Sequence, residues 1–223
     1  MTEKEVVKKI ESYVQEKMSK EEESHGFRHV ERVRKWALKI GKIEGGVDLF
    51  LLEVAALLHD IGRIKETKKI SHDVAGEKMA RGFLSKLNFF SPAEIDLLCF
   101  CVLKHGAGDK QAVGTKKKLL QILQDADRMD MWGATSIVRT TNFLPDKPLY
   151  INRQSFKLKK LTRDQVNQMV KNGQIHKSII DNLVINLSCY DHANTKAARR
   201  LARDKVNYLR NFLKQLQKET VDL

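Results

Sequence analysis

Residues 49–63 read LFLLEVAALLHDIGR, and this stretch decides the fold. Its first ten residues are apolar on nearly every side of a helix, which is typical of a helix buried at the centre of a protein. The run is too short to cross a bilayer, and Glu53 interrupts it. His59 and Asp60 follow directly, and an adjacent imidazole and carboxylate are costly to bury without partners. A cation bound at the end of this helix would offset that cost.

The rest of the chain has a helical pattern as well. Only three prolines occur, and no alternating run of β-branched residues is long enough for a strand. SPAE at 91–94 and TRDQ at 162–165 have the form of capping boxes, and Asp48 is expected to cap the central helix. The sequence predicts an all-α protein with helices at about 3–19, 27–44, 48–61, 72–88, 92–105, 116–131, 162–172, 176–188 and 192–218.

One segment departs from this pattern. Residues 133–161 hold a glycine, two of the three prolines and a polar tract. We expect an irregular excursion there, as a lid or a subunit contact. No repeat or linker is visible, so the sequence predicts one domain over 1–223. Its core would lie at about 20–131, and the helices at about 162–218 would pack on that core.

Composition excludes several classes of protein. The chain has 223 residues, 42% of them apolar, with few prolines and glycines, which excludes collagen-like and low-complexity chains. Three cysteines argue against a secreted disulfide scaffold and are expected to be buried thiols. The N-terminal residues lack the apolar core of a signal peptide. A cytoplasmic protein with no membrane segment is expected.

The positive charge is uneven. The formal net charge of +13 divides into +2 over residues 1–110 and +11 over residues 111–223. A basic half attracts polyanions such as nucleic acid, nucleotides, phosphorylated metabolites or acidic membrane, but it also arises from solvated helix faces. The last helix is basic and amphipathic, a pattern typical of a packing helix and also of membrane-binding helices.

Histidines and aspartates carry the chemical signal. His29 lies early in a helix, His59 and Asp60 end the central helix, and Asp127 lies on a mostly apolar helix. Two imidazoles with two carboxylates suit manganese, iron, cobalt, nickel, zinc or magnesium. Such a metal leaves positions open for water and phosphate oxygen, and it activates that water for attack on phosphorus.

These residues, in this order, resemble the H…HD…D signature of the HD-domain metal-dependent phosphohydrolases. Their surroundings are similar to segments of a small single-domain bacterial branch: HGFRHVERV (25–33), EVAALLHDIGR (53–63), QDADRMDMWGA (124–134) and the closing helix NTKAARRLARDKVNYLRNFLKQLQKE (194–219). The resemblance covers about residues 20–218. It implies a helical bundle whose ligands converge from several helices, with His29, His59, Asp60 and Asp127 holding one divalent metal.

The resemblance also suggests roles for nearby residues. Asp127 fits the motif better than Asp125, which with Asp130 is expected to orient Arg128 or to cap helices. His72 and His105 follow in the order seen in binuclear members. They could hold a second metal, contact the substrate phosphate or be structural. With Asp60 they form the expected catalytic set. His25 is a candidate entrance residue, and the sequence gives no role to His176 or His192.

Basic side chains beside these motifs are candidates for binding substrate phosphate. They are Arg63, Lys65 and Lys104, with Arg28 behind them. Arg63 departs from the family pattern, because several branches place an acid or a histidine there. Arginine cannot act as a general base at neutral pH, so either metal-bound hydroxide suffices or the acid comes from elsewhere, such as Asp73 or Asp130.

The sequence thus predicts a metal-dependent phosphohydrolase acting on nucleotides or similar small phosphorylated molecules. In the most similar branch, the resemblance implies a nucleoside triphosphate pyrophosphohydrolase. The alternatives are a protein that binds nucleotide or nucleic acid without turnover and a module that senses a nucleotide signal. No motif in the chain supports nucleic-acid binding, and the sequence leaves the oligomeric state open.

Overall fold

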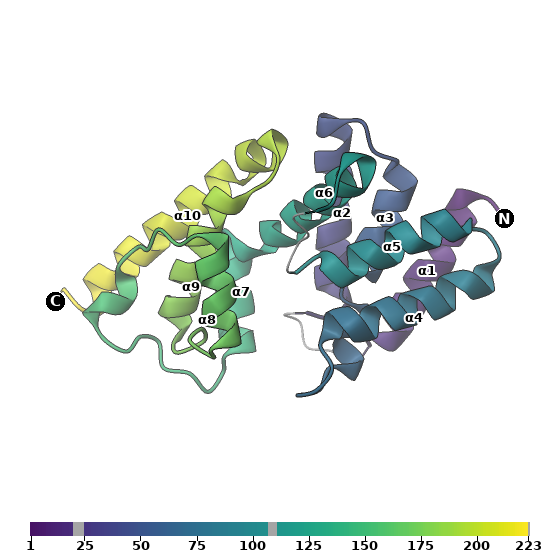
Figure 1. Cartoon of the computed structure of the whole chain (residues 1–223). Helices are drawn as coiled ribbons and strands as arrows, with labels where there is room; N and C mark the ends of the chain where they lie inside the picture. Colours follow the sequence, from purple (N-terminus) through teal and green to yellow (C-terminus); the bar gives the residue numbers. More distant parts are fainter. Residues whose placement is uncertain (20–24, 107–110, 223) are drawn as a thin grey trace. The chain divides into compact units, whose positions relative to one another are not determined.

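The computed structural model describes residues 1–19, 25–106 and 111–222, and every regular element in these ranges is helical (Figure 1). The prediction of an all-α fold is therefore confirmed. The chain divides into two compact units, Met1–Asp127 and Arg128–Leu223. The single domain expected from the sequence stays a prediction.

The first unit contains six α-helices and one 3-10 helix. They are α1 (Glu3–Lys17), α2 (Phe27–Glu44), α3 (Leu49–Leu58), η1 (Ile61–Lys65), α4 (His72–Leu87), α5 (Pro92–Lys104) and α6 (Gly114–Arg128), whose last residue already belongs to the second unit. The apolar helix α3 packs against α1, α2 and α5, and its Leu52, Leu57 and Leu58 are fully buried. α4 and α5 lie side by side (Figure 1).

Glu53, the one charged residue of α3, has a specific partner. Its Oε1 accepts a hydrogen bond from Arg34 Nε of α2 at 2.7 Å, and Arg34 Nη1 lies 3.2 Å from Glu11 Oε2 of α1. One guanidinium thus joins three helices. This pairing explains how a carboxylate interrupts the apolar stretch without breaking the core.

The 3-10 helix η1 packs closely on α4 through two glycines. A Cβ atom at Gly62 would overlap the carbonyl oxygen of His72 and the backbone nitrogen of Gly76. The two backbones approach this closely only because neither glycine has a side chain. The contact fixes the start of α4 beside the residues that follow α3.

Helix boundaries agree with the capping signals. Ser91 and Glu94 form a reciprocal capping box on α5, and Asp48 accepts hydrogen bonds from the first turn of α3. The box at Thr162 also forms. A further box at Thr2 and Glu5 starts α1 and was not identified from the sequence.

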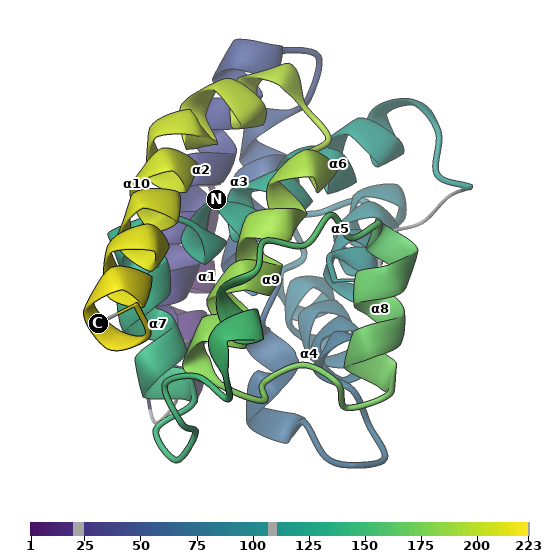
Figure 2. The ribbon, with the colours of Figure 1, turned by 90° about the vertical axis from the view of Figure 1, so that its left-hand side faces the viewer.

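The second unit is built around α9. It contains η2 (Met129–Met131), α7 (Ala134–Phe143), η3 (Arg153–Phe156), α8 (Arg163–Lys171), α9 (Ile179–Ser188), η4 (Cys189–His192) and α10 (Lys196–Thr220). α9 contacts α7, α10 and the short helices η2, η3 and η4. α10 runs beside α9 (Figure 2). The indole of the buried Trp132 donates to the carbonyl oxygen of Asn186 at 2.8 Å.

The segment expected to be irregular contains a helix, α7, over ten of its residues. The glycine, the two prolines and the polar tract favoured a loop, and the sequence of α7, ATSIVRTTNF, is rich in residues with modest helix propensity. Packing outweighs that preference. Asn182 and Asn186 of α9 donate to the hydroxyls of Thr140 and Ser136, and both hydroxyl side chains are buried. Beyond α7, the only regular element through residue 161 is the short η3.

No helix in the described ranges has both the length and the apolar character needed to cross a membrane. The three cysteine thiols are buried and free, and burial raises the pKa of each.

Candidate metal centre

Two histidines of the first unit occupy equivalent places at helix ends. His59 directly follows α3, and its Nδ1 donates to the Ala56 carbonyl oxygen at 2.8 Å. His105 directly follows α5, and its Nδ1 donates to the Val102 carbonyl oxygen at the same distance. Because a carbonyl oxygen can only accept, each Nδ1 carries a proton. The opposite nitrogen, Nε2, is then the atom presented to a ligand.

His29, His59 and Asp127 form the first donor group, from α2, the end of α3 and α6. His29 Nε2 lies 3.3 Å from His59 Nε2 and 3.3 Å from Asp127 Oδ1. Both imidazoles are buried, whereas the Asp127 side chain is 31% exposed. The group is therefore closed by the protein on the histidine side and reaches solvent at Asp127.

Asp60, His72 and His105 form the second donor group. Asp60 Oδ1 lies 3.3 Å from His105 Nε2 and 3.8 Å from His72 Nε2. His72 is the first residue of α4, which the Gly62–Gly76 contact holds against η1. Three elements thus supply one group.

Asp60 connects the two groups through its separate oxygens. Oδ2 lies 3.8 Å from both His29 Nε2 and His59 Nε2 of the first group, while Oδ1 faces the second. The carboxylate is 3% exposed, and Oδ1 makes no hydrogen bond with the described part of the chain. A buried oxygen without a hydrogen bond needs another partner, and a cation satisfies that need.

The donor atoms fit a divalent cation. Nitrogen and oxygen ligands stand about 2.0–2.2 Å from zinc and similar ions, so ligand atoms that share an ion are about 3 Å or slightly more apart. The separations of 3.3 Å within the first group are of this size. Imidazole with carboxylate suits borderline to hard divalent ions.

The electrostatics of the groups are strongly coupled. Burial disfavours a charged Asp60, but His59, His105 and Arg63 outweigh burial and hold the pKa of Asp60 well below its usual range. The pKa of Asp127 is likewise lowered, because the contacts of this carboxylate with His29 and His59 outweigh the effect of burial. Both carboxylates are therefore ionised at neutral pH.

The pKa values of the two helix-end histidines shift in opposite directions. Burial lowers the pKa of His59 to about 4, so its ring is neutral at pH 7. Burial also opposes the charge of His105, but Asp60, Asp127 and Asp73 outweigh it and raise its pKa to about 9. In the absence of a cation, a proton on His105 partly balances the buried carboxylates.

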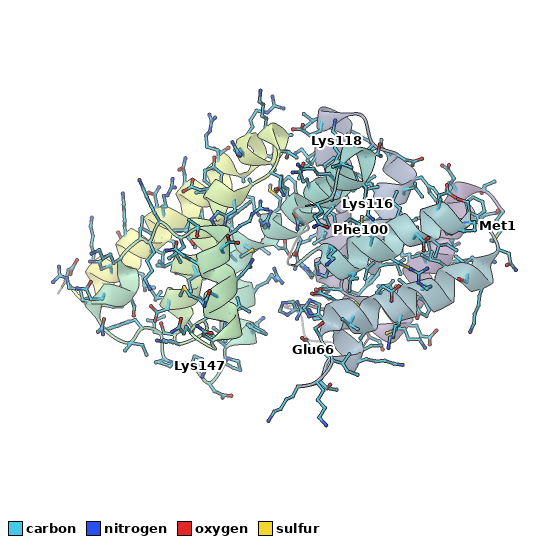
Figure 3. The ribbon with its side chains drawn as sticks, viewed as in Figure 1. Met1, Glu66, Phe100, Lys116, Lys118 and Lys147 are labelled. Carbon is cyan, nitrogen blue, oxygen red and sulfur yellow. The ribbon has the colours of Figure 1, made fainter. Side chains whose placement is uncertain are left out.

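Two acidic residues support His72. Asp73 Oδ1 lies 3.1 Å from His72 Nε2 and 3.4 Å from His105 Nδ1, and it is a second buried oxygen without a hydrogen bond among the described residues. Glu66, labelled in Figure 3, lies 3.1 Å from His72 Nδ1 through Oε1. Sequence reasoning named Asp73 only as a candidate acid and missed Glu66, because nothing in a loop sequence shows which side chain turns back toward a helix.

The side chains expected to bind phosphate lie in different places in the structure. Arg63 Nε pairs with Asp60 Oδ2 at 3.1 Å, and its Nη1 lies 3.4 Å from Glu66 Oε2. Lys104 is half-buried at the end of α5, next to His105. Lys65 is exposed and lines a pocket whose walls include none of the donor side chains.

Other residues from the sequence lie outside the two groups. Asp125 is fully buried on α6 and joins neither group. Asp130 lies in the second unit with Arg139 Nη1 3.6 Å from its Oδ2. His25 precedes α2, and its ring centroid is 6.0 Å from that of His29. In the second unit, His176 contacts Asn182 and His192 contacts the Leu161 carbonyl.

Two features identify the class of this protein. They are the helical bundle and the histidines that lie beside an adjacent His-Asp pair. Residues 26–132 match the HD domain. The chain is 28% identical over 225 residues to the uncharacterised protein YpgQ of Bacillus subtilis (strain 168), covering 98% of this chain and 96% of that one. The fold is similar to the crystal structure of YpgQ in complex with ADP, with 24% identity, full coverage of both chains and a TM-score of 0.70.

A second solved structure, an HD-superfamily hydrolase from Bacillus thuringiensis, is 25% identical with a TM-score of 0.67 and covers 98% of both chains. A protein from Lactobacillus plantarum has the same fold at 22% identity and a TM-score of 0.72, covering 96% of this chain and 95% of that one. The chain therefore contains an HD domain and is similar to an HD-superfamily hydrolase over nearly its whole length.

Proposed function

We propose that this chain is a metal-dependent phosphohydrolase that acts on nucleotides. The observation that carries the proposal is the Asp60 carboxylate, which is buried between two sets of donor atoms and has one oxygen toward each. A divalent cation held there would activate water and polarise the phosphorus centre. His29, His59, Asp60 and Asp127 would hold it.

The second donor group supports a second cation. Asp60 Oδ1, His72 Nε2 and His105 Nε2 face one another, and Asp73 Oδ1 lies close to both rings. Among the roles that the sequence leaves open for His72 and His105, a ligand role agrees best with these contacts. Glu66 would keep His72 directed toward this position through its contact with Nδ1.

The substrate is a nucleotide in this proposal. A structure of the related YpgQ contains ADP, which supports nucleotide binding in this chain. Lys104 lies next to His105 and would neutralise phosphate oxygens. Arg63 already pairs with Asp60 and Glu66, so it would bind phosphate only by sharing its remaining donors.

The bond that we propose is cleaved is the α–β phosphoanhydride of a nucleoside triphosphate. One water molecule adds across it, and the products are a nucleoside monophosphate and pyrophosphate. Release of orthophosphate alone would instead indicate a nucleotidase. The cytoplasmic location predicted from the sequence belongs to this proposal as well.

The test compares two matched variants with the wild-type chain. Metal-free protein is loaded separately with manganese, magnesium, nickel, cobalt and zinc, and is assayed on ribo- and deoxynucleoside tri-, di- and monophosphates with phosphate and pyrophosphate quantified separately. Asp60→Asn removes the shared carboxylate. Asp96→Asn makes the same chemical change at an exposed position on α5.

We expect metal-dependent release of pyrophosphate from the wild type and Asp96→Asn, and none from Asp60→Asn. Absence of turnover in a protein that still binds metal would overturn the proposal. Nucleic-acid binding would then become the leading alternative, and it would be measured as a salt-dependent gel shift.

A further inference from the structure

A pocket of about 490 Å³ lies on the first unit, apart from the donor groups. Its walls come from α1, η1, the loop after η1 and α4. Its lining among the described residues includes three lysines, Lys65, Lys78 and Lys86, and no acidic residue. A pocket of this volume is large enough for a small organic ligand.

The three lysines of this pocket make no hydrogen bond or ion pair with the described residues. Elsewhere on α4, the neighbouring Arg81 is paired with Glu77 and Asp96. Three unpaired ammonium groups around one hollow produce a positive potential. Such a potential favours a ligand with several negative charges.

The wall of the pocket is apolar between the lysines. Tyr13 of α1 stacks on Phe83 of α4 with ring centroids 3.9 Å apart, and Met79 and Ile70 lie in the same lining. This surface suits the carbon skeleton or ring system of an organic ligand better than a free inorganic anion.

Gly82 keeps the pocket open. It lies on α4 midway between Lys78 and Lys86, at a spacing of four residues from each, and so on the same side of the helix. Glycine weakens a helix interior, yet a Cβ atom here would meet nothing within 4 Å. No packing contact with the described part of the chain accounts for the glycine, whereas a side chain at this position would project into the space between the two lysines.

We propose that this pocket is a second, non-catalytic binding site for an organic polyphosphate. The ammonium groups of Lys65, Lys78 and Lys86 would bind the phosphates, and the apolar wall would bind the organic portion. The site does not depend on hydrolysis at the metal centre.

The pocket shares structural elements with the metal centre. Lys65 ends η1, the helix that begins directly after Asp60, and α4 begins with His72 and then lines the pocket from Ala75 to Lys86. The pocket and the metal centre are therefore adjacent along η1 and α4, although they are formed by different side chains of these two helices.

The test is calorimetric titration of the full chain in EDTA, which keeps metal-dependent substrate binding out of the measurement. The probes are ATP and inorganic triphosphate. Lys78→Gln/Lys86→Gln removes two pocket charges, and Lys68→Gln/Lys69→Gln removes two exposed charges outside the lining. Gly82→Leu fills the pocket, and Gly82→Ala is its control for helix stability.

We expect ATP to bind the wild type more tightly than inorganic triphosphate. The pocket double variant and Gly82→Leu should each weaken ATP binding by at least about tenfold, because the first removes two charged contacts and the second occupies the space of the ligand. The control double variant and Gly82→Ala should change it by less than about twofold. Metal-dependent hydrolysis, if the wild type has it, should persist in Gly82→Leu.

Several results would overturn the proposal. One is the absence of ATP binding in EDTA, and another is equal weakening by both lysine pairs, which would indicate unspecific charge attraction. Loss of hydrolysis in a folded Gly82→Leu would make the pocket part of the substrate site. A wild type without hydrolysis would leave the binding measurement intact, so the two proposals fail separately.

Discussion

The imidazole of His105 and the carboxylate of Asp60 face each other at 3.3 Å, although they follow different helices that begin more than 40 residues apart in the sequence. Both side chains are buried. In the metal-free protein this contact is a charged pair, because Asp60 raises the pKa of His105 and His105 lowers that of Asp60. A cation in the second donor group would take the place of the His105 proton.

We therefore expect cation binding to release protons. With a pKa of about 9, His105 is protonated at pH 7 in the metal-free protein, and the pKa of His72 is also raised. Asp60 and Asp127 are already ionised and have no proton to lose. The apparent affinity should rise between pH 6.5 and 9, because fewer protons then have to be displaced.

Titration calorimetry at pH 7 in buffers with different ionisation enthalpies measures this release. The slope of observed heat against buffer enthalpy gives the number of protons. A slope near zero would show that the second group takes up no cation at that pH.

The two donor groups should be separable by mutation. His72→Asn removes a ligand of the second group only, and His29→Asn removes a ligand of the first. We expect each variant to retain fewer cations per chain than the wild type, with Asp60→Asn impaired in both groups. Elemental analysis after gel filtration gives the count, and equal metal content in His72→Asn and the wild type would argue for a single cation.

Removing the cation should lower thermal stability. A ligand that binds only the folded state adds about 2.7 kcal/mol when its free concentration is 100 times Kd. For a protein of this size, that corresponds to a rise in Tm of roughly 5–10 °C. Differential scanning calorimetry with EDTA and with manganese measures the change, and Asp60→Asn should show little of it.

Ser91→Ala tests the helix that positions His105. The Ser91 hydroxyl accepts from the Glu94 amide, and the Glu94 carboxylate accepts from the Ser91 amide at 2.7 Å. Loss of this cap should cost about 1 kcal/mol of unfolding free energy. Metal content at saturating cation should be unchanged, because Ser91 lies at the opposite end of α5 from His105. Urea denaturation gives the free energy, and an unchanged midpoint would show that the box contributes little.

Much of the fold was accessible from the sequence because its signals are local. The apolar run at Leu49–Leu58 and the boxes at Ser91 and Thr162 act within a few residues. α7 was missed because its stability comes from hydroxyl groups that contact asparagines more than 40 residues away. A pattern of neighbouring residues does not reveal contacts between residues so far apart in the sequence.

The same distinction applies to the candidate site. The sequence picked out His59 and Asp60 because two polar residues at the end of a buried helix are unusual. It could not show that the oxygens of Asp60 face two different groups, or that Arg63 pairs with Asp60. Lys65 looked like a phosphate ligand by its position in the chain, but the course of η1 places it in the lysine-lined pocket.

The backbone contact at Gly62 makes one position unusually intolerant of change. Any side chain there would push against the His72 carbonyl and Gly76, so it would move the start of α4 away from η1. His72 would then be displaced from Asp60 although neither residue had been altered. If every residue were replaced in turn and metal retention were measured, each replacement at Gly62 should therefore lower retention as much as the removal of a metal ligand does. Gly62 would do so although it carries no functional group.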